Sequence, residues 1–473
     1  MLFPTIQFAV FFLVVLLASW LLMPRQVRWK PFILAASYVF YAAWDWRFIG
    51  LLVASTVINQ TGAMALCRVA DDRRRRWLLA AVVGADLVLL GWFKYYGFFA
   101  TSLADLLEPL GAAPPLPLLE VVLPVGISFF TFQAISYVVD VYRRHIDPAT
   151  PIDFAVYLAF FPHLVAGPIV RATEFVPQLC RPRDPRRVDG ARAFTLIAGG
   201  LFKKVVVANL LATTLVDPVF ASPASHSSAE ILAAIYGYAV QIYADFSGYT
   251  DIAIGCALLL GFQFPQNFDR PYTAVSLQDF WRRWHMTLSR WLRDYLYIPL
   301  GGSEAGAGDT RVAARRTERN LLLTMVLGGL WHGAAWTFVV WGVLHGLGLM
   351  LGRRRAADPK RLRATPWVAR LLTFHVVCLA WVFFRADSLA AAGTLLWRLV
   401  TAWGPAPLVT PTILIVILLA LAAQYIPRDA GARLQVVFSR VGPVMQGAAM
   451  GGALLVIDAL GPVGVAPFIY FQF

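Results

Sequence analysis

Apolar runs long enough to enter a membrane recur along almost the whole chain. Of the 473 residues, 59% are hydrophobic and only 14% carry charge, and the mean hydropathy is +0.64. Soluble domains carry roughly 25% charged residues and about 45–50% apolar ones. The chain therefore has too little charge to cover a water-soluble surface, and we predict that it crosses a membrane many times. At about 35–45 residues per span and connection, its length accommodates roughly 10–13 membrane-crossing or re-entrant segments.

Only short polar connections separate the apolar runs, and none is long enough to hold a soluble domain. The runs cover residues 6–23, 31–44, 48–66, 77–93, 121–141, 154–170, 193–215, 231–264, 320–351, 367–384, 390–403, 412–425 and 444–460. Several are well short of the ~20 residues that an upright span needs, which is typical of re-entrant or interfacial helices. Backbone groups at membrane depth must be satisfied internally, and the alternating segments of a membrane barrel are absent from the sequence. The sequence therefore predicts an all-α bundle that forms a single domain over residues 1–473.

Basic residues gather in the connections between the runs. The chain has 41 Lys and Arg against 27 Asp and Glu, which gives a formal net charge of +14. The clusters lie at residues 25–30, 73–76, 181–187, 311–319 and 353–363. This distribution is typical of cytoplasmic loops that face anionic lipid, and it argues against nucleic acid as a partner. Because the first cluster follows the first apolar run and no basic residue precedes that run, we expect the amino terminus outside the cytoplasm.

The cysteines give no sign of a metal site or a disulfide framework. Cys67, Cys180, Cys256 and Cys378 are widely separated and form no C-x-x-C pair, so we expect neither a metal ion nor a bound cofactor. Function must instead be sought among polar residues in apolar surroundings. An ionisable side chain inside a span costs at least ~2.5 kcal/mol and usually faces a cavity.

His332 is the clearest candidate for catalysis. It follows Trp331 in the apolar stretch 327–336, where glycines and other small residues allow a helix or a substrate chain to approach the imidazole. We interpret it as a general base, with a hydrogen bond between helices as the structural alternative. His345 lies thirteen residues further on, about 3.6 turns if the helix is continuous. It either lines the same tunnel or packs between helices.

Two further histidines stand in unusual segments. His285 lies in 280–302, where aromatic residues and leucines recur at helical spacing and most arginines fall elsewhere. This pattern predicts an amphipathic helix at the interface that ends at Pro299 and a glycine pair, with His285 beside its apolar face. His163 lies between two prolines in 160–169. Such a broken helix either shapes a pore or is simply kinked, with His163 as a cap.

A polar cluster interrupts the apolar run 231–264. It contains two carboxylates, two phenols and two hydroxyls: Tyr243, Asp245, Ser247, Tyr249, Thr250 and Asp251. Asp245 and Tyr249 share a helix face because they are four residues apart. The cluster either binds arginine or a sugar hydroxyl, orients the imidazole of His332, or pins two helices together. Asp245 is the carboxylate that we favour for a functional role.

Several of these segments together resemble the membrane-bound O-acyltransferase (MBOAT) family, and most closely its bacterial branch typified by alginate O-acetylase. The segments are 161–168 (Phe-Pro-His-Leu-Val-Ala-Gly-Pro), 281–302, 328–346, 381–386 (Trp-Val-Phe-Phe-Arg-Ala) and the terminal 467–473. The resemblance runs almost from end to end. Its most specific part is the Trp-His-Gly segment at His332 combined with the Trp-His-Met-Thr-Leu-Ser segment at His285.

The resemblance implies an architecture and a site. It implies about eleven transmembrane helices with re-entrant or interfacial helices around a central tunnel, located in a bacterial inner membrane. The histidine of the Trp-His-Gly segment, His332, is the essential residue of that family, and His285 is a second candidate in the tunnel. Asp245 is our candidate for orienting His332. We further expect the tunnel to be lined by His163, Tyr243, Tyr249, Trp331 and His345.

The resemblance also implies a reaction. A membrane-embedded base activates a hydroxyl against an acyl thioester, such as acetyl-CoA, that is supplied from the cytoplasm. The expected outcome is O-acetylation of an extracytoplasmic polysaccharide, an alginate-like exopolysaccharide in particular. The expected partners are an extracytoplasmic acetyltransferase and the polysaccharide synthesis and export machinery. The alternatives are D-alanyl transfer to teichoic acid from a carrier-protein thioester, acylation of a lipid or protein, and transport of a polar substrate, against which the lack of an internal repeat argues.

Overall fold

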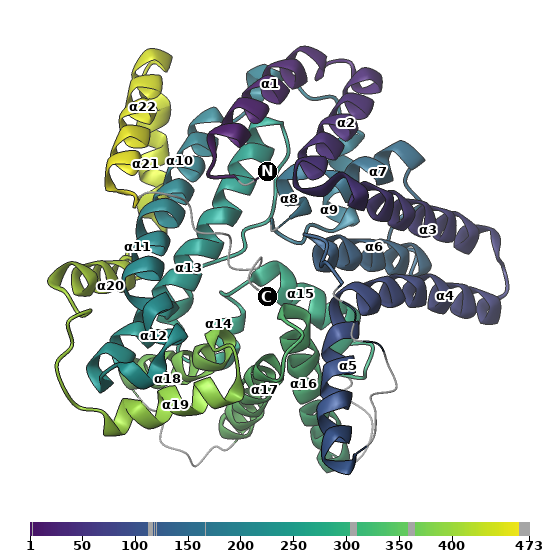
Figure 1. Ribbon diagram of the computed structural model, residues 1–473. Coiled ribbons are helices and arrows are strands. Elements are labelled where there is room, and N and C mark those ends of the chain that lie inside the picture. The colour runs from purple at the N-terminus through teal and green to yellow at the C-terminus, as the bar shows by residue number, and fades with distance from the viewer. Residues whose placement is uncertain are drawn as a thin grey trace. The chain divides into compact units, whose positions relative to one another are not determined.

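The computed structural model describes residues 1, 3–111, 117, 119, 121–165, 167–302, 310–357 and 365–462. The terminal segment 467–473, which contributed to the family resemblance, lies outside these residues. The described chain is helical and contains no strand, which confirms the predicted all-α class. Helices from different parts of the sequence pack beside one another (Figure 1).

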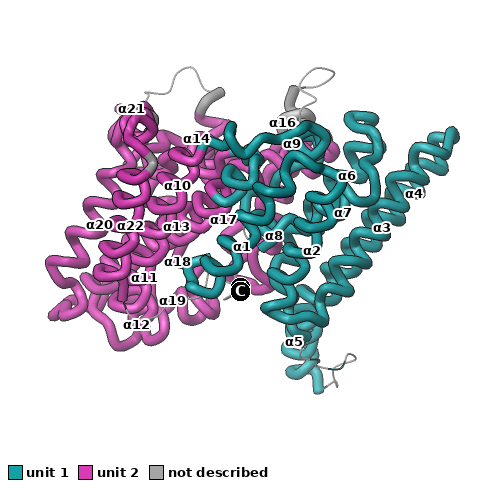
Figure 2. Tube along the Cα trace, turned by 90° about the horizontal axis from the view of Figure 1, so that it is seen from above, with its two compact units in different colours: residues 1–189, 256–265 teal, residues 190–255, 266–473 magenta. Residues whose placement is uncertain are grey.

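The chain forms two compact units (Figure 2). Unit 1 consists of residues 1–189 and 256–265, and unit 2 consists of residues 190–255 and 266–473. The single domain expected from the sequence stays a prediction. We describe each unit separately.

Unit 1 is built around a buried helix. Its helices are α1 (Ile6–Leu22), α2 (Gln26–Asp45), α3 (Ile49–Arg68), α4 (Asp72–Leu90), α5 (Tyr96–Leu107), α6 (Ile127–Tyr142), α7 (Pro151–Ala159), α8 (Phe161–Leu164) and α9 (Ala172–Leu179). Helix α6 is buried along almost its whole length and packs against α3 and α4. Polar side chains tie these helices together: Asn59 donates to Asp86 at 2.9 Å, and the hydroxyl of Tyr137 donates to Gln60 at 3.0 Å.

Unit 2 holds most of the candidate site. Its helices are α10 (Gly190–Leu201), α11 (Asn209–Leu211), α12 (Asp217–Ala221), α13 (Ser228–Leu259, whose last turn belongs to unit 1), α14 (Leu277–Trp281), α15 (Met286–Leu292), α16 (Thr310–His332), α17 (Trp336–Ala357), α18 (Pro366–Arg385), α19 (Leu389–Thr401), α20 (Pro411–Ala423), α21 (Arg428–Arg440) and α22 (Pro443–Leu460). The segments Phe202–Ala208, Ala212–Val216 and Arg293–Tyr297 are π-helical, a geometry that is frequent at functional sites.

Helices α16 and α17 form a hairpin rather than one long helix. The apolar run 320–351 is interrupted at residues 333–335, directly after His332. At the other end of the hairpin, Arg354 donates two hydrogen bonds of 2.6 Å to the carboxylate of Glu318. The arginine-rich ends of both helices are therefore held together, and His332 and His345 lie on different helices.

Four stretches of the described chain are long and apolar enough to span a membrane by length and composition. They are Gln26–Arg68, Asp72–Leu110, Gly190–Ala221 and Pro366–Arg385. Five shorter apolar helices accompany them: Ile6–Leu22, Ile127–Tyr142, Leu389–Thr401, Pro411–Ala423 and Val444–Leu460. This pattern fits a polytopic membrane protein that includes short helices. The count of about eleven spans stays a prediction.

Candidate active site

His332 ends helix α16 and is enclosed by aromatic rings. Only 3% of the residue is exposed. Its imidazole lies 5.0 Å from the ring of Trp331, 5.1 Å from Trp341 and 5.2 Å from Phe384, measured between ring centroids. These rings come from α16, α17 and α18. They give the imidazole the water-poor surroundings in which its interactions with a reacting group are strongest.

Close packing of the hairpin places His332 among these rings. A Cβ atom at Gly342 of α17 would lie 2.5 Å from the carbonyl oxygen of Met325 and 2.8 Å from the Cα of Val326, both on α16. Gly329 of α16 faces the backbone of Phe338 just as closely. The two backbones approach this far only because the contact residues are glycines. The small residues noted in the sequence therefore serve helix contact.

His285 lies beside His332. The centroids of the two imidazole rings are 6.4 Å apart, and His285 is fully buried. The two residues, far apart in the sequence, therefore come together in the structure. The ring of His285 also meets Phe246 of α13 edge to face at 4.7 Å and Trp331 at 6.0 Å.

The segment around His285 is not the continuous amphipathic helix that the sequence predicted. Helix α14 ends at Trp281, and α15 begins at Met286. His285 stands between them in a left-handed conformation with φ +41° and ψ +54°. Few non-glycine residues adopt this conformation, and those that do are concentrated at functional sites. The predicted apolar face is nevertheless buried, as shown by Trp284 and Leu288.

His345 is buried on α17 and is connected to His332 through Trp341. The ring of Trp341 lies 4.7 Å from His345 and 5.1 Å from His332. The indole N–H of Trp281 donates to Nδ1 of His345 at 3.3 Å. These contacts are those of a residue that packs between helices. A place in the tunnel stays a prediction.

Asp245 forms a buried ion pair with Lys204, and only 5% and 3% of their side chains are exposed. Lys203 pairs with Asp251 at 2.5 Å and donates to the hydroxyl of Ser247 at 3.0 Å. The polar cluster of α13 thus binds two consecutive lysines of the π-helical segment Phe202–Ala208. We did not identify these lysines in the sequence. The signal was available, because two cations stand inside the apolar run 193–215.

Both tyrosines of the cluster lie on α13, and Tyr243 is half-buried there. Tyr243 lies 6.0 Å from Phe268, again between ring centroids, and the ammonium of Lys203 stands 5.9 Å from its ring centre. Tyr249 is fully buried. Gly200 of α10 and Gly248 of α13 contact each other's backbones, which brings the lysines close to the carboxylates. The cluster therefore joins α13 to α10 and to the π-helical segment Phe202–Ala208. A role in lining a tunnel stays a prediction.

His163 belongs to unit 1 and is fully buried. Its Nε2 lies 2.8 Å from the carbonyl oxygen of Tyr157. Because a carbonyl only accepts, Nε2 carries the hydrogen. The imidazole is packed among Phe160, Phe175 and Phe264, with centroids 5.3–5.6 Å away. These contacts accord with the interpretation of a histidine that stabilises a broken helix.

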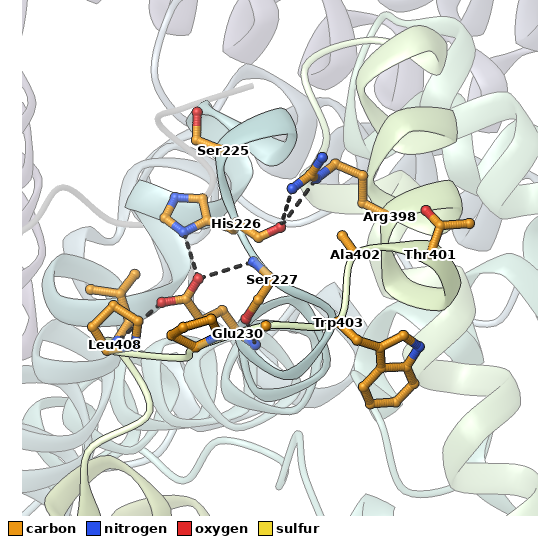
Figure 3. Close-up of a pocket in the computed structure, with 12 residues that line it drawn as sticks. Ser225, His226, Ser227, Glu230, Arg398, Thr401, Ala402, Trp403 and Leu408 are labelled. Carbon is orange, nitrogen blue, oxygen red and sulfur yellow. Dashed lines mark hydrogen bonds and ion pairs between the residues drawn. The ribbon is translucent and has the colours of Figure 1, made fainter.

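A separate cavity of about 610 Å³ lies at the start of α13 in unit 2 (Figure 3). Glu230 accepts from the backbone N–H groups of Ser227 and Leu408 at 3.1 Å each, and it lies 3.1 Å from Nδ1 of His226. Ser227 and Glu230 form a capping box, since the serine hydroxyl accepts from the Glu230 N–H at 3.4 Å. Arg398 donates to the carbonyl of His226. The carboxylate of Glu230 thus caps the helix and fixes the loop of Leu408.

No group of three or more His, Cys, Asp or Glu in the described part of the chain could hold a metal ion. Aromatic rings lie around both His332 and His285. The prediction that the protein binds neither a metal nor a cofactor stays open.

Comparison with known proteins identifies the family. The family model of MBOAT, the membrane-bound O-acyltransferase family, matches residues 87–391, which include both His285 and His332. The chain is similar to the probable alginate O-acetylase AlgI of Azotobacter vinelandii, with 42% identity over 85% of this chain and 78% of that protein. It is also similar to the peptidoglycan O-acetyltransferase of Helicobacter pylori, with 38% identity over 77% of this chain and 72% of the relative.

A more distant relative is the teichoic acid D-alanyltransferase of Streptococcus thermophilus. It is 28% identical over 55% of this chain and 68% of its own length. The O-acetyltransferases therefore share more of the chain with this protein, and at higher identity. The family match covers more than half of the chain, and it agrees with the apolar helices and the paired histidines described above. The chain belongs to the membrane-bound O-acyltransferase family and is a multi-pass membrane protein with O-acyltransferase activity.

Proposed function

We propose that this protein carries acetyl groups from a cytoplasmic thioester towards an extracytoplasmic polysaccharide, with His332 as the general base. The observation that carries the proposal is the pair of imidazoles, His332 and His285, 6.4 Å apart in an aromatic enclosure. Similarity to an alginate O-acetylase and to a peptidoglycan O-acetyltransferase supports acetyl as the acyl group and a polysaccharide as the final acceptor. An alginate-like exopolysaccharide is our first choice.

In the proposed step, His332 takes the proton of an acceptor hydroxyl as its oxygen attacks the thioester carbonyl. The new C–O bond forms, the C–S bond breaks, and the departing thiolate takes the proton back from the imidazolium. Base catalysis of this kind contributes roughly 10²–10⁴-fold to a rate. A hydroxyl hydrogen-bonds to nitrogen at about 2.8 Å, so two neighbouring hydroxyls of one acceptor molecule can each reach one of the two imidazoles. His285 then binds the acceptor through a second hydroxyl, beside the one that His332 deprotonates.

The position of the base inside the membrane suits a donor and an acceptor on opposite sides. Thioesters such as acetyl-CoA are made in the cytoplasm, whereas the polymer lies outside. The rings of Trp331, Trp341 and Phe384 keep water from the thioester and limit wasteful hydrolysis. We assign the protein to a bacterial inner membrane with its amino terminus outside. Its partners would be an extracytoplasmic acetyltransferase that completes the transfer and the polysaccharide synthesis and export machinery.

The remaining candidate residues receive supporting roles in this proposal. Asp245 orients the site, either by holding α13 through its ion pair with Lys204 or by acting on His332. Trp331 and His345 shape the enclosure around the base. Tyr243 and Tyr249 on α13 line the route of the substrates in this proposal, and a tunnel position for His163 of unit 1 stays a prediction. D-alanyl transfer to teichoic acid is the alternative reaction, and the test below separates it from acetylation.

The test compares strains that lack the chromosomal gene and carry a variant on a plasmid. The acetyl content of the cell-surface polysaccharide is measured, and protein abundance in the membrane is checked by immunoblotting. We expect wild type to restore acetylation and His332→Ala to lower it by at least about a hundredfold. The matched control is His375→Ala, because His375 is an exposed histidine of α18 in the same unit.

Two outcomes would overturn the proposal. Acetylation that persists in the His332→Ala strain at equal abundance would remove His332 from the mechanism. Unchanged acetyl content in the strain without the gene would remove the acetyl-to-polysaccharide assignment. Loss of ester-linked D-alanine in that strain would then establish the alternative reaction.

A further inference from the structure

Asn267 receives three hydrogen bonds on a single oxygen. Its side-chain Oδ1 lies 3.1 Å from the backbone nitrogen of Thr287, 2.9 Å from the hydroxyl of Thr287 and 3.2 Å from Nδ1 of His285. At most 1% of each of the three residues is exposed. The network therefore lies in the interior of unit 2, directly beside the paired imidazoles.

The backbone nitrogen of Thr287 decides how this network is protonated. Its N–H can only donate, so the amide atom that faces it must be the oxygen of Asn267. That oxygen can only accept, so the nitrogen of His285 that faces it must carry a hydrogen. His285 is therefore the Nδ1–H tautomer. In a neutral imidazole, the other nitrogen, Nε2, then bears a free lone pair.

The backbone reinforces this arrangement. The N–H of Met286 donates to the carbonyl of Asn267 at 2.9 Å, and the N–H of Asp269 donates to the carbonyl of Arg283 at 2.9 Å. The segment 267–269 is thus bonded on both sides of His285, which holds this residue in its left-handed conformation. Surrounding structure must over-determine a backbone conformation of this kind for it to persist. Here segment 267–269 supplies the bonds that do so.

The lone pair on Nε2 is buried and unused by the described residues. None of them hydrogen-bonds to Nε2 of His285. The rings around His285 are Phe246 of α13, Phe268, and Trp331 and His332 of α16, and of these only His332 titrates. Asp245, next to Phe246, is paired with Lys204. A buried acceptor without a donor is costly, and a substrate hydroxyl would satisfy it.

We propose that Asn267 is a positioning residue that holds His285 as the Nδ1–H tautomer, so that Nε2 accepts a hydrogen bond from a second hydroxyl of the acceptor, beside the hydroxyl that His332 deprotonates. The inference rests on the proposed function for the identity of that hydroxyl, but the tautomer itself does not depend on it. His332 and His285 then have different tasks. His332 removes the proton of the attacking hydroxyl, and His285 accepts a hydrogen bond from the second hydroxyl, which orients the acceptor towards the thioester.

The first test replaces the amide by a carboxylate of the same shape. In Asn267→Asp, both oxygens still accept from Thr287 and His285, so a purely structural role is preserved. The negative charge, however, favours the imidazolium form of His285, whose Nε2 then donates instead of accepting. We expect at least tenfold lower kcat at pH 7 and a pH–activity curve whose rising limb moves upward by at least one pH unit. The matched control, Asn320→Asp, changes a buried asparagine of α16 that donates to the carbonyl of Leu300, and it should keep the wild-type curve.

The assay uses purified protein in detergent, acetyl-CoA as the donor and alginate oligosaccharides as the acceptor. A wild-type protein that fails to release free thiol in this assay would contradict direct transfer to a polysaccharide hydroxyl, and the tautomer measurement below then tests the inference by itself. If the wild-type protein is active and Asn267→Asp keeps the wild-type pH curve at equal yield, the inference is overturned. The proposed function is not affected by that result. If Asn267→Asp does not fold, Asn267→Ser loses the fixed acceptor, and we expect a roughly tenfold lower kcat with an unchanged KM. An unchanged kcat would overturn the inference.

A second measurement reads the tautomer without any activity. Solid-state NMR of protein labelled with ¹⁵N at histidine shows which ring nitrogen bears hydrogen, and the signal of His285 is assigned by its disappearance in His285→Gln. We expect hydrogen on Nδ1 and none on Nε2 in the wild-type protein. Hydrogen on Nε2 in the resting protein would overturn the inference even if acetyl transfer proceeds.

Discussion

The indole of Trp341 meets the imidazole of His332 edge to face, with ring centroids 5.1 Å apart and planes at 82°. Trp341 is 1% exposed, and no described residue hydrogen-bonds to its indole nitrogen. Its contribution to the site is therefore that of an aromatic surface. A smaller aromatic ring should serve the same purpose, whereas a methyl group should not.

We therefore predict a clear difference between Trp341→Phe and Trp341→Ala. The alanine variant leaves a cavity beside the base and should destabilise the protein by about 3–5 kcal/mol, with a more than tenfold loss of polysaccharide acetylation. The phenylalanine variant keeps the ring contact and should retain most of the activity. Thermal unfolding in detergent and acetyl content check the two effects. Equal loss in both variants would show that the indole itself is required.

The buried pair of Lys204 and Asp245 gives a second prediction. Removal of one partner, as in Asp245→Asn, leaves an uncompensated buried charge and should cost about 3–5 kcal/mol. The double variant Lys204→Met with Asp245→Leu replaces the pair by apolar side chains of similar volume and should recover the stability. We expect the double variant to recover acetylation as well, measured per unit of protein in the membrane. A stable but inactive double variant would instead show that Asp245 acts on His332.

The helix contact at Gly342 predicts the effect of one methyl group. Gly342→Ala places a Cβ against the carbonyl of Met325, and the two helices must separate. Such overpacking should cost about 1–3 kcal/mol and displace His332 from its aromatic enclosure, with a several-fold lower acetyl transfer. Gly352→Ala on the same helix is the control, because a Cβ there meets nothing within 4 Å. Similar stability and activity in both variants would contradict close packing as the reason for Gly342.

The capping box at the start of α13 predicts a variant that separates stability from activity. Glu230→Ala removes the acceptor for two backbone N–H groups, those of Ser227 and Leu408. We expect a loss of about 1–2 kcal/mol of stability and a normal acetyl content of the polysaccharide at a permissive temperature. Thermal unfolding and acetyl analysis of the same membranes provide the comparison. Loss of acetylation without loss of stability would give the cavity beside Glu230 a functional role.

Composition and apolar runs predicted the helical class, because the membrane leaves few alternatives to helices. Individual helix ends were harder to predict. The break at 333–335 lies inside an apolar run. The break before Met286 depends on hydrogen bonds that Met286 and Thr287 donate to Asn267, which is distant in the sequence. Periodicity reports only local patterns, so a bend that tertiary contacts impose leaves no signal in it.

The candidate site, like the helix ends, could be predicted from the sequence only in part. The family motifs pointed to His332 and His285 separately, and packing of α16 against the turn before α15 brings their rings together. Lys203 and Lys204 were not identified, because the partners of a buried cation lie on another helix and their pairing is visible only in three dimensions. The role of Asn267 depends on which atom faces the N–H of Thr287. No spacing in the sequence carries that information.

The hairpin of α16 and α17 also fixes the distance between its charged end and His332. Arg319 marks the charged end of the hairpin. Beyond Asn320, helix α16 continues without a break for twelve residues and ends at His332. At 1.5 Å per residue, this length of helix places the base about 18 Å from the charged end. Under the proposed function, a thioester that arrives from the arginine-rich side needs a chain of at least that length behind its sulfur to reach His332. The proposed function therefore predicts that the hairpin discriminates between donors by the length of this chain.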